Sequence, residues 1–159
     1  MKRALSIAFI LSFLIFAGCS TKYYEKPQPA LIVLKSPLLK YADMGFIFRG
    51  KNSTKVQIYS SGRPAFTLSI GRRVCVDSMC MSEGEFYRKY LKAEYPPGTL
   101  KNIFSKSPIF GGENLQRRGE ESVQHIEKEG RFDIIYTFDK SSVRFKDRLN
   151  NILIKITER

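Results

Sequence analysis

The sequence has no tryptophan and only one histidine, His125, among its 159 residues. A single imidazole excludes any site that needs two, and it disfavours histidine-rich zinc sites and histidine-dependent hydrolytic triads. The chain has no P-loop, Gly-x-Ser-x-Gly elbow, dinucleotide fingerprint or calcium loop. No candidate nucleophile stands with an activating base. We therefore expect no enzymatic activity, no bound metal and no cofactor.

The composition is that of one globular domain, with 43% hydrophobic and 26% charged residues. No repeat of roughly 20–50 residues recurs, which disfavours solenoids and propellers. Lys and Arg total 27 against 15 Asp and Glu, for a net charge of +12. In a cytosolic protein that excess would suggest nucleic acid. In an exported one it suggests anionic lipid head groups or acidic protein surfaces, with solubility as the plainer explanation.

The N-terminal segment predicts export. Basic residues at positions 2 and 3 precede an apolar run from Ala4 to Gly18, which is shorter than the roughly 20 residues of a membrane span. This order is typical of a secretory signal peptide. The end of the run, Phe16-Ala17-Gly18-Cys19, resembles the bacterial lipobox Leu-Ala-Gly-Cys, with Phe in place of Leu.

The lipobox resemblance implies cleavage before Cys19 and attachment of lipid to its thiol. We therefore expect a signal peptide over 1–18, a lipidated N-terminus and tether over 19–30, and one domain over 31–159. Residue 20 is Ser. In enteric bacteria an Asp at this position commonly retains a lipoprotein in the inner membrane, so the sequence favours the periplasmic face of the outer membrane. An ordinary signal peptide with a chance cysteine is the alternative.

The other two cysteines, Cys75 and Cys80, form an even pair in a compartment where disulfides persist. The segment around them reads as strand, two-residue turn at 77–78, and strand. Such a turn would place the cysteines opposite each other, with Cα atoms about 4.5 Å apart. We predict a structural disulfide, with two free thiols as the alternative.

Most of the remaining chain has strand composition. The strands are expected at 31–34, 44–49, 55–59, 64–76, 132–138, 142–145 and 151–156, with turn residues between them. Strict alternation in Phe66-Thr-Leu-Ser-Ile70 predicts a sheet with one buried face. The polar segment 111–128 is expected to be a mobile loop with a weak strand at 123–126.

Two helices are expected in the middle of the chain. A capping box at Ser82-Glu-Gly-Glu85 begins the first, and Pro96-Pro97 is expected to end it. A shorter one follows from Thr99 and is closed at Pro108. Strands, helices and strands again make an α+β order. We predict a strongly curved antiparallel sheet, an unclosed half-barrel, with the two helices covering its concave side.

The middle of the chain resembles the outer-membrane lipoprotein receptor family LolB, within the LolA/LolB superfamily. The similar segments follow one another in the family's order: 55–68, 74–77 with 82–91, 95–104 closing at 107–109, 130–136, and 151–156. Together they cover roughly residues 44–156. The tryptophans common in the family are absent from this chain. The family has an exposed leucine in its membrane-inserting turn, and the corresponding position here is Ala65-Phe66.

The resemblance implies a lid of helices over an apolar cavity that receives the acyl chains of lipoproteins from a periplasmic LolA-like carrier. The receptor then releases them into the outer membrane, acting as a monomer without making or breaking bonds. The expected cavity residues are Phe46, Phe48, Ile58, Leu68, Phe86, Tyr90, Leu91, Leu100, Ile103, Phe104 and Ile135. The alternative for each of them is ordinary packed core.

The resemblance also assigns the turn formed by Arg63, Pro64, Ala65 and Phe66 to contact with the membrane. For Phe66 the alternative is that it begins the inward-facing series with Leu68 and Ile70. Two other functions are compatible with the sequence. The domain could hold another lipid or glycolipid, or it could be an envelope scaffold without a ligand pocket.

Overall fold

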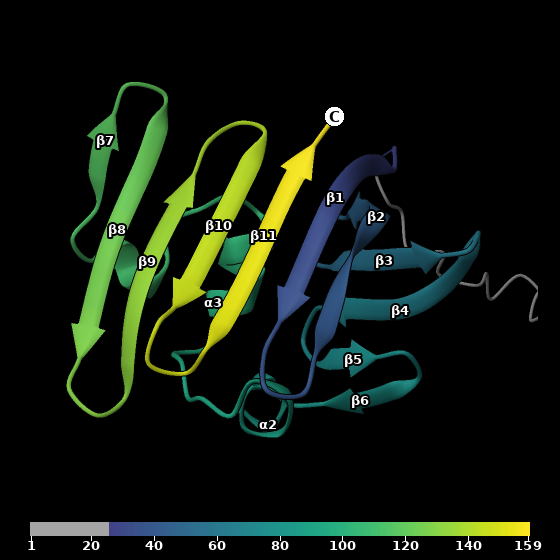
Figure 1. The fold of residues 1–159 in the computed structure, drawn as a ribbon, viewed down its shortest axis with the longest axis horizontal. Coiled ribbons are helices and arrows are strands. Elements are labelled where there is room, and N and C mark those ends of the chain that lie inside the picture. Colours follow the sequence, from purple (N-terminus) through teal and green to yellow (C-terminus); the bar gives the residue numbers. More distant parts are fainter. Residues whose placement is uncertain (1–25) are drawn as a thin grey trace, which may run out of the picture.

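The computed structural model describes residues 26–159, and they form one antiparallel sheet with short helices on one side (Figure 1). The strands follow the order β6-β5-β4-β3-β2-β1-β11-β10-β9-β8-β7. Their bounds are β1 Gln28–Lys35, β2 Lys40–Arg49, β3 Thr54–Ser60, β4 Arg63–Ile70, β5 Val74–Val76, β6 Met79–Met81, β7 Gln116–Arg118, β8 Glu121–Lys128, β9 Phe132–Phe138, β10 Ser142–Asp147 and β11 Ile152–Glu158. The α+β fold and the unclosed curved sheet are as predicted.

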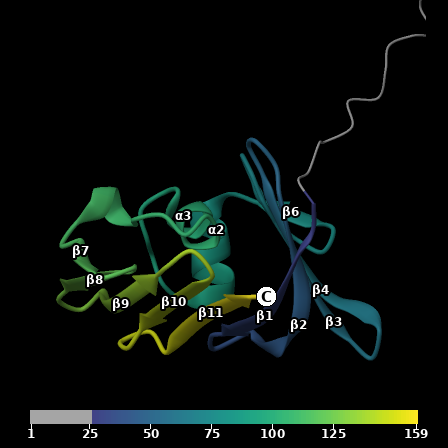
Figure 2. The same cartoon turned by 90° about the horizontal axis from the view of Figure 1, so that it is seen from above.

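Two wings of the sheet meet at an angle, and the helices lie inside that angle (Figure 2). One wing contains β1 to β6 and the other β7 to β11, joined where β1 pairs with β11. Neighbouring strands come from hairpins except at this junction, where the first and last strands of the fold meet. The concave face carries the buried side chains of both wings.

Gly45 marks a close approach of β2 to β3. A Cβ atom added there would lie 2.2 Å from the backbone oxygen of Gln57 and 2.9 Å from Cδ1 of Ile32. Real Cβ atoms do not approach backbone oxygen that closely, so no other residue fits without moving a strand. The glycine therefore allows β2 to pack tightly where the sheet curves.

The first helix begins as predicted. Ser82 accepts a hydrogen bond from the backbone N–H of Glu85, and the Glu85 carboxylate accepts one from the Ser82 backbone. Helix α2, Glu83–Phe86, continues as the π-helix η2, Tyr87–Leu91. It ends at Lys92, whose backbone is left-handed, and not at the prolines where the sequence placed its end.

The second helix, α3, covers Thr99–Phe104, followed by the 3-10 turn η3 at Phe110–Gly112. Two expectations for the chain outside the helices are wrong. Segment 111–128 contains β7 and the long strand β8, because β8 pairs with β9 along most of its length. The expected tether 19–30 overlaps β1, which begins at Gln28.

Candidate functional site

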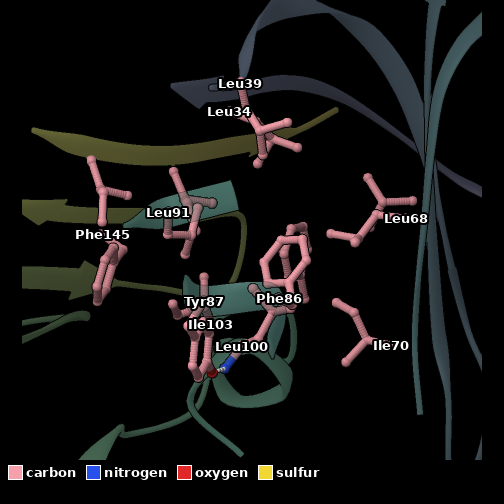
Figure 3. Packing of buried hydrophobic residues seen from close by; sticks show 14 of the residues in the cluster. Leu34, Leu39, Leu68, Ile70, Phe86, Tyr87, Leu91, Leu100, Ile103 and Phe145 are labelled. Atoms are coloured by element: carbon pink, nitrogen blue, oxygen red, sulfur yellow. Dashed lines mark hydrogen bonds between the residues drawn. The ribbon is translucent and has the colours of Figure 1, made fainter. Parts of the chain in front are cut away.

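Most of the expected cavity residues meet where the helices cover the concave face (Figure 3). Leu68 from β4 faces Phe86, Leu91, Leu100 and Phe104 from the helical segments. The gap among them, closed also by side chains of β1 and β11, has a volume of only about 10 Å³. That is about the space of one water molecule, so the centre is closed and packed in this structure. Ile58 and Ile103 are buried in the same cluster.

Three of the expected residues lie elsewhere. Phe46 and Phe48 point away from the helices, because Ile47 between them is the residue that faces the concave side, paired with Val56. In β9, Ile134 is fully buried and Ile135 lies on the outer face opposite Lys146. The cavity assignments of Phe46, Phe48 and Ile135 are therefore wrong. Tyr90 is half-buried at the edge of the cluster, its ring 5.3 Å from that of Phe86.

An open groove lies beside this closed centre, between the segment that leads into α3 and the β8–β9 hairpin. Its volume is about 730 Å³. Three rings form an aromatic cluster there: Phe110 and Phe132 are 5.3 Å apart between ring centroids, and Tyr95 lies 6.4 and 6.1 Å from them. Charged side chains at the groove are Glu94, Glu113, Glu127, Lys128 and Arg131.

Buried polar contacts fix the walls of the groove. The Tyr95 hydroxyl donates to Oδ2 of the fully buried Asp147, at 2.5 Å. Burial, together with this carboxylate, raises the pKa of Tyr95, so the phenol stays protonated. On the other side, the Gln124 amide accepts from the Ile109 backbone N–H at 2.9 Å and donates to the Ile109 carbonyl at 3.0 Å. It also donates to the Glu113 carbonyl, which holds segment 109–113 against β8.

The two helical segments are joined by Glu83. Its carboxylate accepts from the backbone N–H groups of Gly98 and Leu100, at 2.8 and 3.0 Å, and from the hydroxyl of Tyr87. Those amides belong to the N-cap residue and the first turn of α3, where the helix itself supplies no acceptor for them. Burial and the neighbouring Glu83 raise the pKa of Tyr87. The first helix therefore caps the second.

A charged cluster joins the end of α3 to both wings. The Glu158 carboxylate in β11 pairs with Arg49 of β2 and, at 2.5 Å, with Lys106 just after α3. Arg49 also donates to the Phe104 carbonyl at 3.3 Å. The side chains of these three charged residues are between 10% and 25% exposed. The cluster fixes the C-terminal end of α3 against the sheet.

The turn assigned to the membrane divides into an exposed part and a buried part. Arg63, Pro64 and Ala65 are exposed, at the start of β4. Phe66 is 2% exposed and its ring lies 4.6 Å from that of Tyr41. Phe66 begins the inward series, so its assignment as a membrane-facing residue is wrong in this structure.

The remaining sequence assignments have mixed outcomes. Cys75 and Cys80 are joined by a disulfide, opposite each other in the β5–β6 hairpin as expected. Cys19 lies outside the described residues. His125 is exposed and contacts Asp133, which Arg148 also binds. Within residues 26–159, no group of three or more His, Cys, Asp or Glu side chains is placed to hold a metal ion.

Sequence reasoning missed the groove. In the sequence, Pro96-Pro97 indicates a helix end and belongs to the LolB-like segment 95–104, but neither feature predicts that Tyr95 lines a groove. Gln124 was placed in a weak strand within a polar loop. The available signal is Ile126, which lies two residues further along the strand and so shares a buried face with Gln124, because an uncharged polar residue on a buried face needs partners.

Against protein-family models, curated proteins and solved structures, the chain has no match. Over residues 26–159, no helix combines the length and the hydropathy needed to cross a bilayer.

Proposed function

We propose that this protein is an outer-membrane lipoprotein receptor. It is anchored through lipid on Cys19, accepts the acyl chains of other lipoproteins from a periplasmic carrier, and releases them into the outer membrane. The observation that carries the proposal is a curved, unclosed sheet whose concave side is apolar and covered by short helices, with an aromatic groove at one end. The lipobox and the resemblance to LolB support the anchor and the cargo.

The groove serves as the entrance in this proposal. Its volume of about 730 Å³ lies within the roughly 300–1,000 Å³ usual for ligand sites, whereas the 10 Å³ gap in the centre does not. An acyl chain that starts on the rings of Tyr95, Phe110 and Phe132 can advance only if α3 moves away from the sheet. The contacts of Glu83 and Glu158 with the two ends of α3 would have to change in that step.

The closed centre favours one other candidate function, an envelope scaffold lipoprotein whose aromatic residues are simply core. A domain of this size needs a packed interior, and the cluster of buried side chains supplies one. In that case the groove would bind no acyl chain, and loss of the protein would leave other lipoproteins correctly placed.

Depletion of the protein separates the two functions. A receptor's loss strands lipoproteins in the periplasm in complex with their carrier, which fractionation and immunoblotting detect. Complementation with Phe110→Glu, or with Pro97→Glu at the exposed rim, should fail to restore outer-membrane delivery although circular dichroism is unchanged. Leu149→Glu is the control, since Leu149 is 52% exposed and lies outside the groove. Normal delivery in the depleted strain would contradict the receptor function.

A further inference from the structure

The outer face of the sheet carries an aromatic patch around the hairpin β2–β3. Phe46 is 38% exposed, and its ring lies 5.7 Å from Tyr59 in an edge-to-face arrangement and 6.5 Å from Phe48. Leu31 of β1, also 38% exposed, and Met44 stand opposite each other on the same face. Exposed apolar side chains gathered in this way mark an interaction surface.

On the outer face of the strands nearest this patch, the charged side chains have one sign. In β1, β2, β3, β10 and β11, every second residue lies on the outer face of the sheet. All the charged residues among these are cationic. They are Lys35, Lys40, Lys55, Arg144, Lys146 and Lys155. Lys55 lies with its Nζ atom 4.4 Å from the centroid of the Phe48 ring. An apolar centre with a cationic surround complements an anionic lipid surface.

The distance to the anchor limits where the domain can lie. Fully extended, the chain from Cys19 to Gln28 spans at most about 30 Å. Gln28 begins β1, and the next residue, Pro29, is paired with Phe46. The patch therefore lies beside the point where the folded domain meets the lipid-bearing segment. A short tether keeps it at high local concentration beside the membrane.

We infer that this outer patch, formed by Leu31, Met44, Phe46, Phe48 and Tyr59, docks on the anionic surface of the membrane that holds the anchor. The inference rests on lipidation of Cys19 in the proposed function. The docked domain presents the outer face to the lipid and keeps the helices on the opposite side of the sheet (Figure 2). The patch lies on β1 to β3, whereas the groove lies in the other wing at the β8–β9 hairpin, which leaves the groove accessible to a partner (Figure 1).

The test uses the absence of tryptophan in the chain. Full-length, lipidated protein with Phe46→Trp is reconstituted in vesicles of phosphatidylethanolamine and phosphatidylglycerol whose acyl chains are brominated. Bromine quenches an indole that reaches the acyl boundary, so we expect the emission to fall relative to that in unbrominated vesicles. Leu149→Trp is the matched control, because Leu149 is an exposed apolar residue outside the patch. Its emission should not change. Tyr59→Trp is a second probe should the first variant fold poorly.

Flotation of the vesicles separates the two proposals. Protein that does not float with the vesicles lacks the anchor, which overturns the proposed function and the docking with it. Protein that floats while the indole of the Phe46→Trp variant stays unquenched keeps the anchor and overturns the docking alone. A blue shift of that indole without quenching indicates that a second protein molecule covers the patch, which also overturns it. Quenching should fall when phosphatidylcholine replaces phosphatidylglycerol or when salt is raised, and insensitivity to both would refute the electrostatic contribution.

Discussion

The hydroxyl of Tyr95 donates a hydrogen bond to Oδ2 of Asp147, a residue 52 positions further along the chain. Asp147 is fully buried at the end of β10, and its carboxylate also accepts from the backbone of Leu149 and Asn150. One contact thus ties the segment before α3 to the β10–β11 turn. It also fixes the ring that forms one wall of the groove.

Tyr95→Phe should lower the free energy of unfolding by about 1–2 kcal/mol, because a buried carboxylate loses one of its donors. Urea titration of the wild type and the variant measures the change. Tyr90→Phe is the control. Tyr90 is half-buried, and its hydroxyl makes no hydrogen bond seen among residues 26–159. Equal stability of all three proteins would show that the Tyr95–Asp147 bond contributes nothing.

Glu158→Gln should loosen the end of α3. The substitution removes the negative charge that Arg49 and Lys106 share, and these pairs are only partly exposed. We expect a loss of about 1–3 kcal/mol, between the values for exposed and buried ion pairs. Hydrogen exchange should rise at the amides of α3 more than at those of β9. Unchanged exchange in α3 would mean that Glu158 does not fix this helix.

Gly45→Ala should destabilise the fold by about 1–3 kcal/mol through overpacking, because the new methyl group would overlap the Gln57 backbone oxygen. Gly84→Ala is the matched control. A Cβ there meets only Arg88 Nη1, at 3.5 Å, and alanine favours a helix, so its melting temperature should be unchanged or slightly higher. The contact at Gly45 would be of no consequence if both variants melted alike.

Asp139 should make the fold sensitive to acid. Hydrogen bonds from the side chain of Ser142 and from Ser141 lower its pKa from 3.8 to about 2. The folded state stabilises the ionised form of Asp139 more than the unfolded state does. This contribution to the free energy of unfolding is therefore fully present above about pH 4. It is lost as the pH falls towards about 2. The drop in melting temperature over this range should be smaller in Asp139→Asn. An identical pH profile in the two proteins would contradict this assignment.

The Cys75–Cys80 bond should stabilise the β5–β6 hairpin at one edge of the sheet. It closes a short loop, for which chain entropy gives roughly 2 kcal/mol. Dithiothreitol should therefore lower the melting temperature of the wild type. The double variant Cys75→Ala, Cys80→Ala should melt like the reduced wild type and be indifferent to the reagent. A wild type that does not respond to reduction would show that the bond does not contribute to stability.

The sequence by itself determined those elements whose signals are local. The capping box at Ser82, the turn between Cys75 and Cys80, and the alternation from Phe66 to Ile70 each depend on neighbours a few residues apart, and each is found as predicted. The α+β order and the curved sheet followed from the succession of such elements.

Only the tertiary structure decided which face of each strand is buried where apolar residues are continuous. Phe46-Ile47-Phe48 and Ile134-Ile135 contain no polar residue to set the alternation. In the first segment Ile47 is the buried residue, because it is paired with buried Val56. In the second, Ile134 is buried because it shares a face with Tyr136, which is paired with buried Phe145. The groove likewise joins Tyr95, Phe110 and Phe132, which are separated in sequence and brought together by the buried contacts of Asp147 and Gln124. Sequence patterns report on neighbours along the chain, whereas these contacts depend on strand pairing and on burial between distant segments.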